Sequence, residues 1–160
     1  MLVTAYSMQA YFREALEAAI RNSNTQMTES AQAYIVHLLN EFCRSEVVFA
    51  GTDYGAKPNM AQLLERALLA QDGEAQRIFR HLGDTSLYLL GFFQESTVQR
   101  IVSQSYYRDM GSQAYLHAST MAKAHSAHTA ALFYELSERF DDIVKVVEII
   151  SRYNKNSEEN

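Results

Sequence analysis

The sequence is poor in residues that break helices or cross-link a chain: its 160 residues include one proline, one cysteine, six glycines and no tryptophan. The single cysteine, Cys43, excludes an internal disulfide and favours a reducing compartment. Long apolar runs are also missing, since none approaches the ~20 residues that a membrane-spanning helix requires. The first residues lack the basic and apolar regions of a secretory signal. The sequence therefore predicts a cytoplasmic protein without a membrane partner.

Positive charge is also scarce in this chain. Lys and Arg number 14 against 19 for Asp and Glu, which gives a net charge of −5. A nucleic-acid-binding surface needs a basic face, so we expect no nucleic-acid partner. With 48% hydrophobic residues, a chain of this length can bury roughly two-thirds of its unfolded surface in one domain. We expect a single helical domain over residues 1–153 and a disordered tail at residues 154–160.

Signatures of catalysis are absent from the sequence. It contains no Gly-x-Ser-x-Gly elbow, no glycine-rich phosphate loop and no dinucleotide-binding fingerprint. Cys43 follows Phe42 in an apolar helical pattern, where an inert buried thiol is the default. An enzyme whose groups converge from distant helices stays open. A protein without enzymatic activity is favoured, and we predict no catalytic residue and no cofactor.

The histidines do not match a known metal-binding pattern. His125 and His128 are three residues apart, and His117 lies upstream of them. Di-iron bundles use Glu-x-x-His spacing on two helices, and zinc hydrolases use two histidines four residues apart with an adjacent glutamate; neither pattern occurs here. No metal site is predicted, and whether these three histidines converge is left open.

The pattern that is present is helical. Apolar residues recur at spacings of three and four, which predicts helices at about 7–21, 29–44, 60–69, 74–93, 97–102, 106–123 and from about 127 to 153. Thr28, Asn59 and Ser96 are the expected N-caps of three of these helices, and Asp72 and Gly73 are expected to end the third. Residues 47–50 form the one strand-like run, which we interpret as the buried end of a connection, and residues 51–58 are predicted to be a loop. The fold prediction is all-α: a single-domain bundle of six or seven helices with a long C-terminal helix and no substantial sheet.

Two stripes of residues indicate how these helices pack. One is a heptad seam in the last helix, which is typical of either a bundle core or a dimer helix; it consists of Phe133, Leu136, Phe140, Ile143, Val147 and Ile150. The other is a stripe of small residues that lets a second helix approach closely; it consists of Gly111, Ala114, Ala118 and Ala122.

The stretch from His81 to Tyr115 is rich in aromatic residues and contains three glycines among large side chains. Glycine costs roughly 1 kcal/mol relative to alanine within a helix, so these glycines indicate close backbone approach or helix ends. The aromatic residues are typical of a core, but they are also candidates to line a pocket for an apolar, aromatic or haem-like ligand. The candidate ligand-binding residues are His81, Asp84, Tyr88, Phe92, Tyr106, Tyr107, Tyr115 and His117.

The same stretch carries a resemblance. Its pattern Gly83-Asp84, Gly91-Phe92-Phe93 and Tyr106-Tyr107-x-x-Met110-Gly111-x-x-Ala114-Tyr115 resembles a core found in small bacterial all-helical proteins that have no named activity. The resemblance covers roughly the middle quarter of the chain. It implies a bacterial source and brings no catalytic residue or cofactor with it.

Two functional hypotheses follow from these patterns. The first is a non-enzymatic interaction or regulatory protein that self-associates, as a homodimer, through a helical face. The second is a protein that binds an apolar or aromatic ligand in the aromatic centre, with His81 or His117 as an axial or polar contact.

Overall fold

The computed structural model describes residues 5–49, 60–92 and 101–158, and the side chains of 8–44, 60–92 and 104–153. The described residues form seven helices and no strand, which confirms the predicted all-α fold. The helices are α1 (Ala5–Ser23), α2 (Glu29–Phe49), α3 (Met60–Leu69), α4 (Asp72–Phe92), α6 (Ile101–Ala122), α7 (Ala127–Glu138) and α8 (Phe140–Glu158). No helix in these ranges combines the length and hydropathy needed to cross a bilayer.

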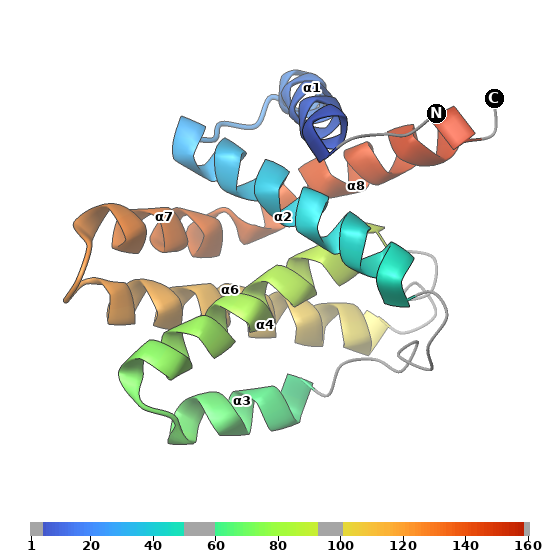
Figure 1. Ribbon diagram of the computed structural model, residues 1–160. Coiled ribbons are helices and arrows are strands. Elements are labelled where there is room, and N and C mark those ends of the chain that lie inside the picture. Colours follow the sequence, from blue (N-terminus) through green and yellow to red (C-terminus); the bar gives the residue numbers. More distant parts are fainter. Residues whose placement is uncertain (1–4, 50–59, 93–100, 159–160) are drawn as a thin grey trace.

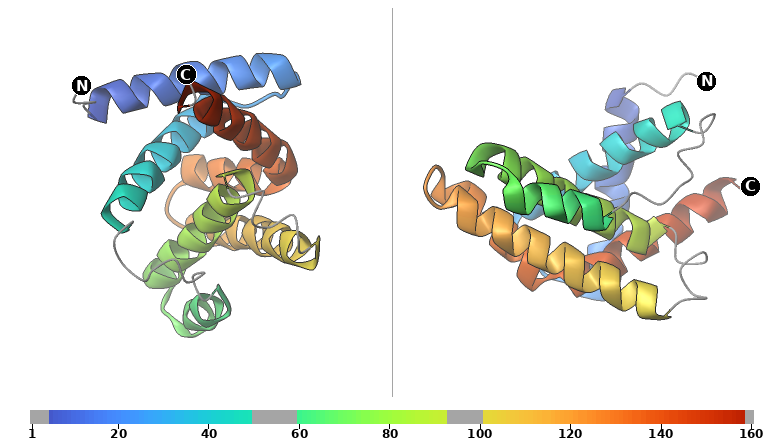
Figure 2. Two further views of the ribbon diagram at one scale, coloured as in Figure 1. Left: turned by 90° about the vertical axis from the view of Figure 1, so that its right-hand side faces the viewer. Right: turned by 90° about the horizontal axis from the view of Figure 1, so that it is seen from below.

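The helices are arranged around α4 and α6, which pack against one another (Figure 1). Helices α6 and α7 run side by side as a hairpin, α8 packs on α4 and α1, and α2 packs on α1. Helices α1 and α3 lie at opposite edges of the molecule, as the left view of Figure 2 also shows.

Local residue chemistry sets the turn between α1 and α2. Asn24 adopts a left-handed conformation with φ of 53°, which asparagine tolerates better than most residues. The backbone N–H of Thr25 donates to the carbonyl of Ile20 at 3.2 Å, so α1 ends at this turn. The hydroxyl of Thr28 then accepts a hydrogen bond from the N–H of Ala31 at 3.2 Å. This confirms the predicted N-cap of α2.

Three predicted boundaries are wrong. Helix α2 continues to Phe49, so residues 47–49 are helical and not strand-like. Once a helix is nucleated, each added residue gains a backbone hydrogen bond, and this gain outweighs the weak strand propensity of the run. Asp72 and Gly73 do not end α3 but begin α4, where the carboxylate of Asp72 is favoured in the first turn by the helix dipole. Ile101 belongs to the same helix as Tyr106, not to a brief helix of its own. The predicted loop at 51–58, Asn59, and residues 96–98 lie outside the described residues.

The long C-terminal helix is broken at Arg139, which has φ of −102° and ψ of 19°. The N–H of Arg139 still donates to the carbonyl of Glu135, at 2.9 Å. Before this break α7 packs on α6, and after it α8 packs on α4 and α1. The change of direction therefore lets both helices bury their apolar faces. Asp141 and Asp142 in the first turn of α8 are the helix-start signal that the heptad pattern concealed. Helix α8 also extends to Glu158, so residues 154–158 are helical where a disordered tail was predicted.

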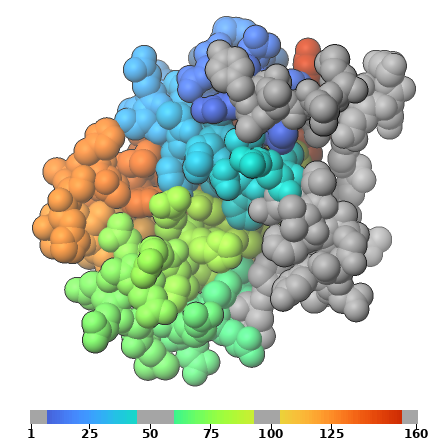
Figure 3. All heavy atoms as spheres, in the orientation of Figure 1, coloured from blue at the N-terminus to red at the C-terminus, as the bar shows by residue number. Residues whose placement is uncertain are grey.

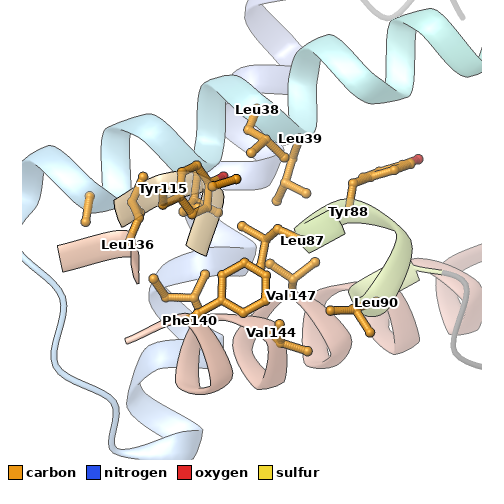
Figure 4. Close-up of a cluster of buried hydrophobic side chains, with 14 of the residues drawn as sticks. Leu38, Leu39, Leu87, Tyr88, Leu90, Tyr115, Leu136, Phe140, Val144 and Val147 are labelled. Atoms are coloured by element: carbon orange, nitrogen blue, oxygen red, sulfur yellow. The ribbon is translucent and has the colours of Figure 1, made fainter. Parts of the chain in front are cut away.

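The heptad seam lies inside the chain. All six of its side chains are at most 3% exposed, and they pack with residues of α2, α4 and α6 (Figure 4). This favours the bundle-core interpretation, because a face that is already buried is not available to a second chain.

The three glycines of the aromatic stretch lie where helices approach closely. A methyl group at Gly83 would lie 2.6 Å from the ring of Tyr115, and methyl groups at Gly91 and Gly111 would overlap the side chains of Val147 and Phe140. All three glycines are within helices and buried. The predicted close backbone approach is thus confirmed at each of them.

Candidate functional site

A partly buried carboxylate in α4, that of Asp84, connects three helices. Its Oδ1 accepts hydrogen bonds from the hydroxyls of Tyr34 in α2 and Tyr115 in α6, each at 2.7 Å. Its Oδ2 lies 3.8 Å from Nε of Arg80, one turn earlier in α4. The guanidinium of Arg80 also lies over the ring of Tyr34, 5.7 Å from its centroid. We refer to Tyr34, Arg80, Asp84 and Tyr115 as the Asp84 cluster.

Packing positions the members of this cluster. The fully buried ring of Tyr115 passes over Gly83, which has no side chain in its way. The ring of Tyr34 meets that of Phe133 in α7 edge-on, with centroids 5.7 Å apart. The spacing of four residues places Arg80 and Asp84 on one face of α4. The cluster is therefore held by side chains from four helices.

Burial dominates the electrostatics of the cluster. It raises the pKa of Asp84, while the hydrogen bonds from the two tyrosines and the nearby charge of Arg80 act in the opposite direction and reduce that rise. Burial, followed by the negative charge of Asp84, raises the pKa of Tyr34 and of Tyr115 well above the usual value for tyrosine. Both hydroxyls therefore stay protonated at neutral pH and act as hydrogen-bond donors.

An open groove of about 550 Å³ lies beside the cluster, between α2, α4 and α7. Figure 3 shows the face on which light-blue α2, orange α7 and green α4 border one another. We refer to this feature as the α2/α4/α7 groove. Nearly all of the lining residues come from the N-terminal halves of these helices. The lining consists of Ser30, Ala33, Tyr34, His37, Gln76, Arg77, Arg80, His128, Thr129, Leu132 and Phe133.

The charge of this groove differs from that of the whole chain. Two arginines and two histidines line it, and none of the lining residues is an aspartate or glutamate, although the net charge of the protein is −5. The side chains of Ala33, Leu132 and Phe133 supply an apolar part of the wall. The groove thus combines hydrogen-bond donors and positive charge with a larger apolar surface.

Polar contacts hold the walls of the groove together. The carboxylate of Glu135 in α7 accepts a hydrogen bond from the N–H of Thr28 at 3.0 Å and another from its hydroxyl at 2.6 Å. The hydroxyl of Ser30 lies 3.5 Å from Nε2 of His128. These contacts fix the start of α2 against α7.

The structure separates the candidate ligand-binding residues of the aromatic stretch. Asp84 and Tyr115 meet in the cluster, but Tyr88 lies on the other side of Leu87 (Figure 4). There its ring stacks on Phe92 with centroids 4.8 Å apart. The buried ring of Tyr88 and the half-buried ring of Phe92 fit the core alternative.

Of the remaining candidates, Tyr106, His81 and His117 are exposed and Tyr107 is buried. Tyr106 is 45% exposed and touches the buried ring of Tyr107, whose pKa is raised by burial. His117 is exposed and stacks on Phe79 with centroids 4.7 Å apart, and His81 is exposed on α4.

Residues outside the aromatic stretch form much of the groove, and we did not predict a site from them. The spacing of Ser30, Ala33, Tyr34 and His37 is that of one helix face. This stripe was the only sequence signal of a site on α2, but its composition is that of an ordinary solvent-exposed helix face. Arg77 likewise has the pattern of a solvent-facing residue of α4.

Within the described ranges, no three His, Cys, Asp or Glu side chains gather where they could hold a metal ion. His117, His125 and His128 therefore do not form such a group. Comparison with known proteins found no matching family model, curated protein or solved structure. The resemblance to small bacterial helical proteins stays a prediction.

Proposed function

We propose that this protein is a non-enzymatic helical binding protein and that the α2/α4/α7 groove is its binding site. The observation that carries the proposal is an open groove, walled by three helices, whose volume of about 550 Å³ is in the range typical of small-molecule sites. The Glu135–Thr28 contacts hold its walls in place before any ligand arrives. Such preorganisation reduces the entropic cost of binding.

The chemistry of the groove favours binding over catalysis. Ser30 and His128 are its one Ser–His pair, but their 3.5 Å separation is long for an activated nucleophile. No carboxylate among the lining residues orients the imidazole of His128. The Oδ1 atom of Asp84 is occupied by two tyrosine hydroxyls, so it is poorly placed to act as a general base.

A groove-filling substitution tests this proposal. Ala33 is exposed on α2 and lines the groove, so Ala33→Trp fills space without disturbing the core. We expect small aromatic probes to shift the amide NMR signals of α2, α4 and α7 in the wild type and to lose this effect in Ala33→Trp. The matched control is Ala10→Trp at an exposed position of α1. Signal shifts that map elsewhere, or binding that survives Ala33→Trp, would contradict the proposal.

We further propose that the protein self-associates through α3. Leu68 and Leu69 at the end of this helix are 67% and 81% exposed, which is unusual for adjacent leucines. Light scattering is expected to detect a dimer that dissociates in the Leu68→Glu/Leu69→Glu double variant and persists in Ala10→Glu. A monomeric wild type at high micromolar concentration would refute self-association.

A further inference from the structure

The α2/α4/α7 groove presents two arginines on one helix face. Arg77 and Arg80 are three residues apart in α4, which places them as neighbours. Arg77 is exposed and makes no ion pair with any other described residue. Guanidinium groups match carboxylates and phosphates because several N–H donors lie in one plane.

The second arginine is held in position. Asp84 lies 3.8 Å from Nε of Arg80, and the ring of Tyr34 lies beneath its guanidinium. Asp84 is only 14% exposed at its side chain, whereas Arg80 is 49% exposed. The acid thus anchors the arginine from the protein side, and the arginine presents its outer surface to the groove. Asp84 offsets one positive charge, which leaves Arg77 as the uncompensated one.

The walls formed by α2 and α7 add further hydrogen-bond donors to those of α4. His128 and Thr129 are in the first turn of α7 and Ser30 is in the first turn of α2, where the helix dipole is positive. His37 is one turn beyond Tyr34 in α2 and also lines the groove. No acidic side chain among the lining residues competes for these groups.

The apolar part of the wall narrows the class of ligand. Leu132 and Phe133 of α7 border the groove together with Ala33. An inorganic anion would leave this surface in water, whereas an anion attached to an apolar or aromatic body would cover it.

We propose that the α2/α4/α7 groove binds a small organic anion, in which a carboxylate or phosphate lies at Arg77 and Arg80 and an apolar body lies against Leu132 and Phe133. This inference rests on the proposed function, because it names the ligand class of the same groove.

Four compounds that share a benzene ring but differ in charge test the inference. Phenyl phosphate, benzoate, benzyl alcohol and benzylamine are titrated into the full chain, and binding is followed by amide NMR. We expect the two anions to bind at least about tenfold more tightly than benzyl alcohol, and benzylamine to bind most weakly. Inorganic phosphate is expected to bind more weakly than phenyl phosphate, because it cannot cover the apolar wall.

Two variants test whether Arg77 is the residue that favours binding of the anion. Arg77→Ala is expected to weaken phenyl phosphate binding about tenfold and leave benzyl alcohol binding unchanged. Arg44→Ala removes the same charge from α2 outside the groove and is expected to leave both unchanged. Both arginines are exposed, so circular dichroism should show wild-type folding.

The outcomes separate the two proposals. Equal binding of all four ring compounds in the groove would overturn the anion inference and leave the proposed function standing. Phenyl phosphate binding that is unchanged in Arg77→Ala, or matched by inorganic phosphate, would also overturn the inference. No binding by any probe would overturn the proposed function and the inference together.

Discussion

The two halves of α4 differ in how they meet their surroundings. In the C-terminal half, Gly83 and Gly91 let the side chains of Tyr115 in α6 and Val147 in α8 approach the backbone closely. In the N-terminal half, Gln76, Arg77 and Arg80 border an open groove. The packed half has little tolerance for added atoms, because interiors are close to crystalline density. The groove residues of the N-terminal half can change their chemistry without changing the fold.

The comparison assigns stability and binding to different residues of one helix. Substitutions in the packed half should lower the free energy of unfolding and affect binding only through loss of folded protein. Substitutions of the groove residues should affect ligand affinity with little change in stability. The Asp84 cluster lies between the two regions and should show intermediate behaviour.

The largest loss is expected for Phe140→Ala. Phe140 is 2% exposed, and its ring lies against Gly111 of α6. Removing the ring leaves a cavity and should lower the free energy of unfolding by about 3–5 kcal/mol. Urea unfolding measures this change. A loss below about 1 kcal/mol would place Phe140 outside the packed core.

A smaller but clear loss is expected for Gly111→Leu. The added side chain would overlap the ring of Phe140 and the Cβ of Ser86, so α6 would be forced away from α4 and α8. Overpacking of this kind should cost about 1–3 kcal/mol. Thermal melting checks the effect, with Gly73→Leu at an unobstructed site as the control. Equal melting temperatures for Gly111→Leu and the wild type would show that the helices are not in close contact.

The Asp84 cluster should make the free energy of unfolding depend on pH in the alkaline range. Burial raises the pKa of Tyr34 and Tyr115 in the folded state above the value of about 10 that tyrosine has in an unfolded chain. The unfolded state therefore loses protons first, so this stabilisation is fully present below about pH 10 and is lost as pH rises toward the folded-state values.

The variant Tyr115→Phe removes one of these two groups. Its free energy of unfolding should fall less steeply above about pH 10 than that of the wild type. At neutral pH it should be less stable by about 1.5–3 kcal/mol, since a hydrogen bond to a carboxylate is lost. Urea unfolding at several pH values measures both effects, with Tyr134→Phe at an exposed position as the control. An unchanged pH dependence would contradict the raised pKa of Tyr115.

The sequence predicted the packed half of α4 better than the groove half. Spacings of three and four identified most helices, and Gly83, Gly91 and Gly111 indicated close approach, because apolar periodicity and missing side chains are local signals. The break at Arg139 was missed, because the heptad spacing from Phe133 to Ile150 continues through it. Asp141 and Asp142 carried the competing signal.

The groove could not be predicted in the same way. Tyr34, Arg77 and His128 come from three helices that are distant in the sequence, and each has the composition of an ordinary surface residue. Asp84 and Tyr115 were both candidate ligand-binding residues, but neither their hydrogen bond nor the contact of Tyr34 with Asp84 was predicted. Which polar faces meet depends on how the helices pack, and periodicity within one helix contains no such information.

The division of α4 into a packed half and a binding half is tested most directly by two variants: Arg77→Ala in the groove, and Gly111→Leu in α6, which lies against Ser86 of α4. Two quantities are measured in each variant, the melting temperature and the affinity for phenyl phosphate. We expect Arg77→Ala to melt like the wild type and bind about tenfold more weakly, and Gly111→Leu to melt lower but bind normally at a temperature where it is folded. If Arg77→Ala lost stability and retained wild-type affinity, the two halves of α4 would not have the separate roles assigned to them.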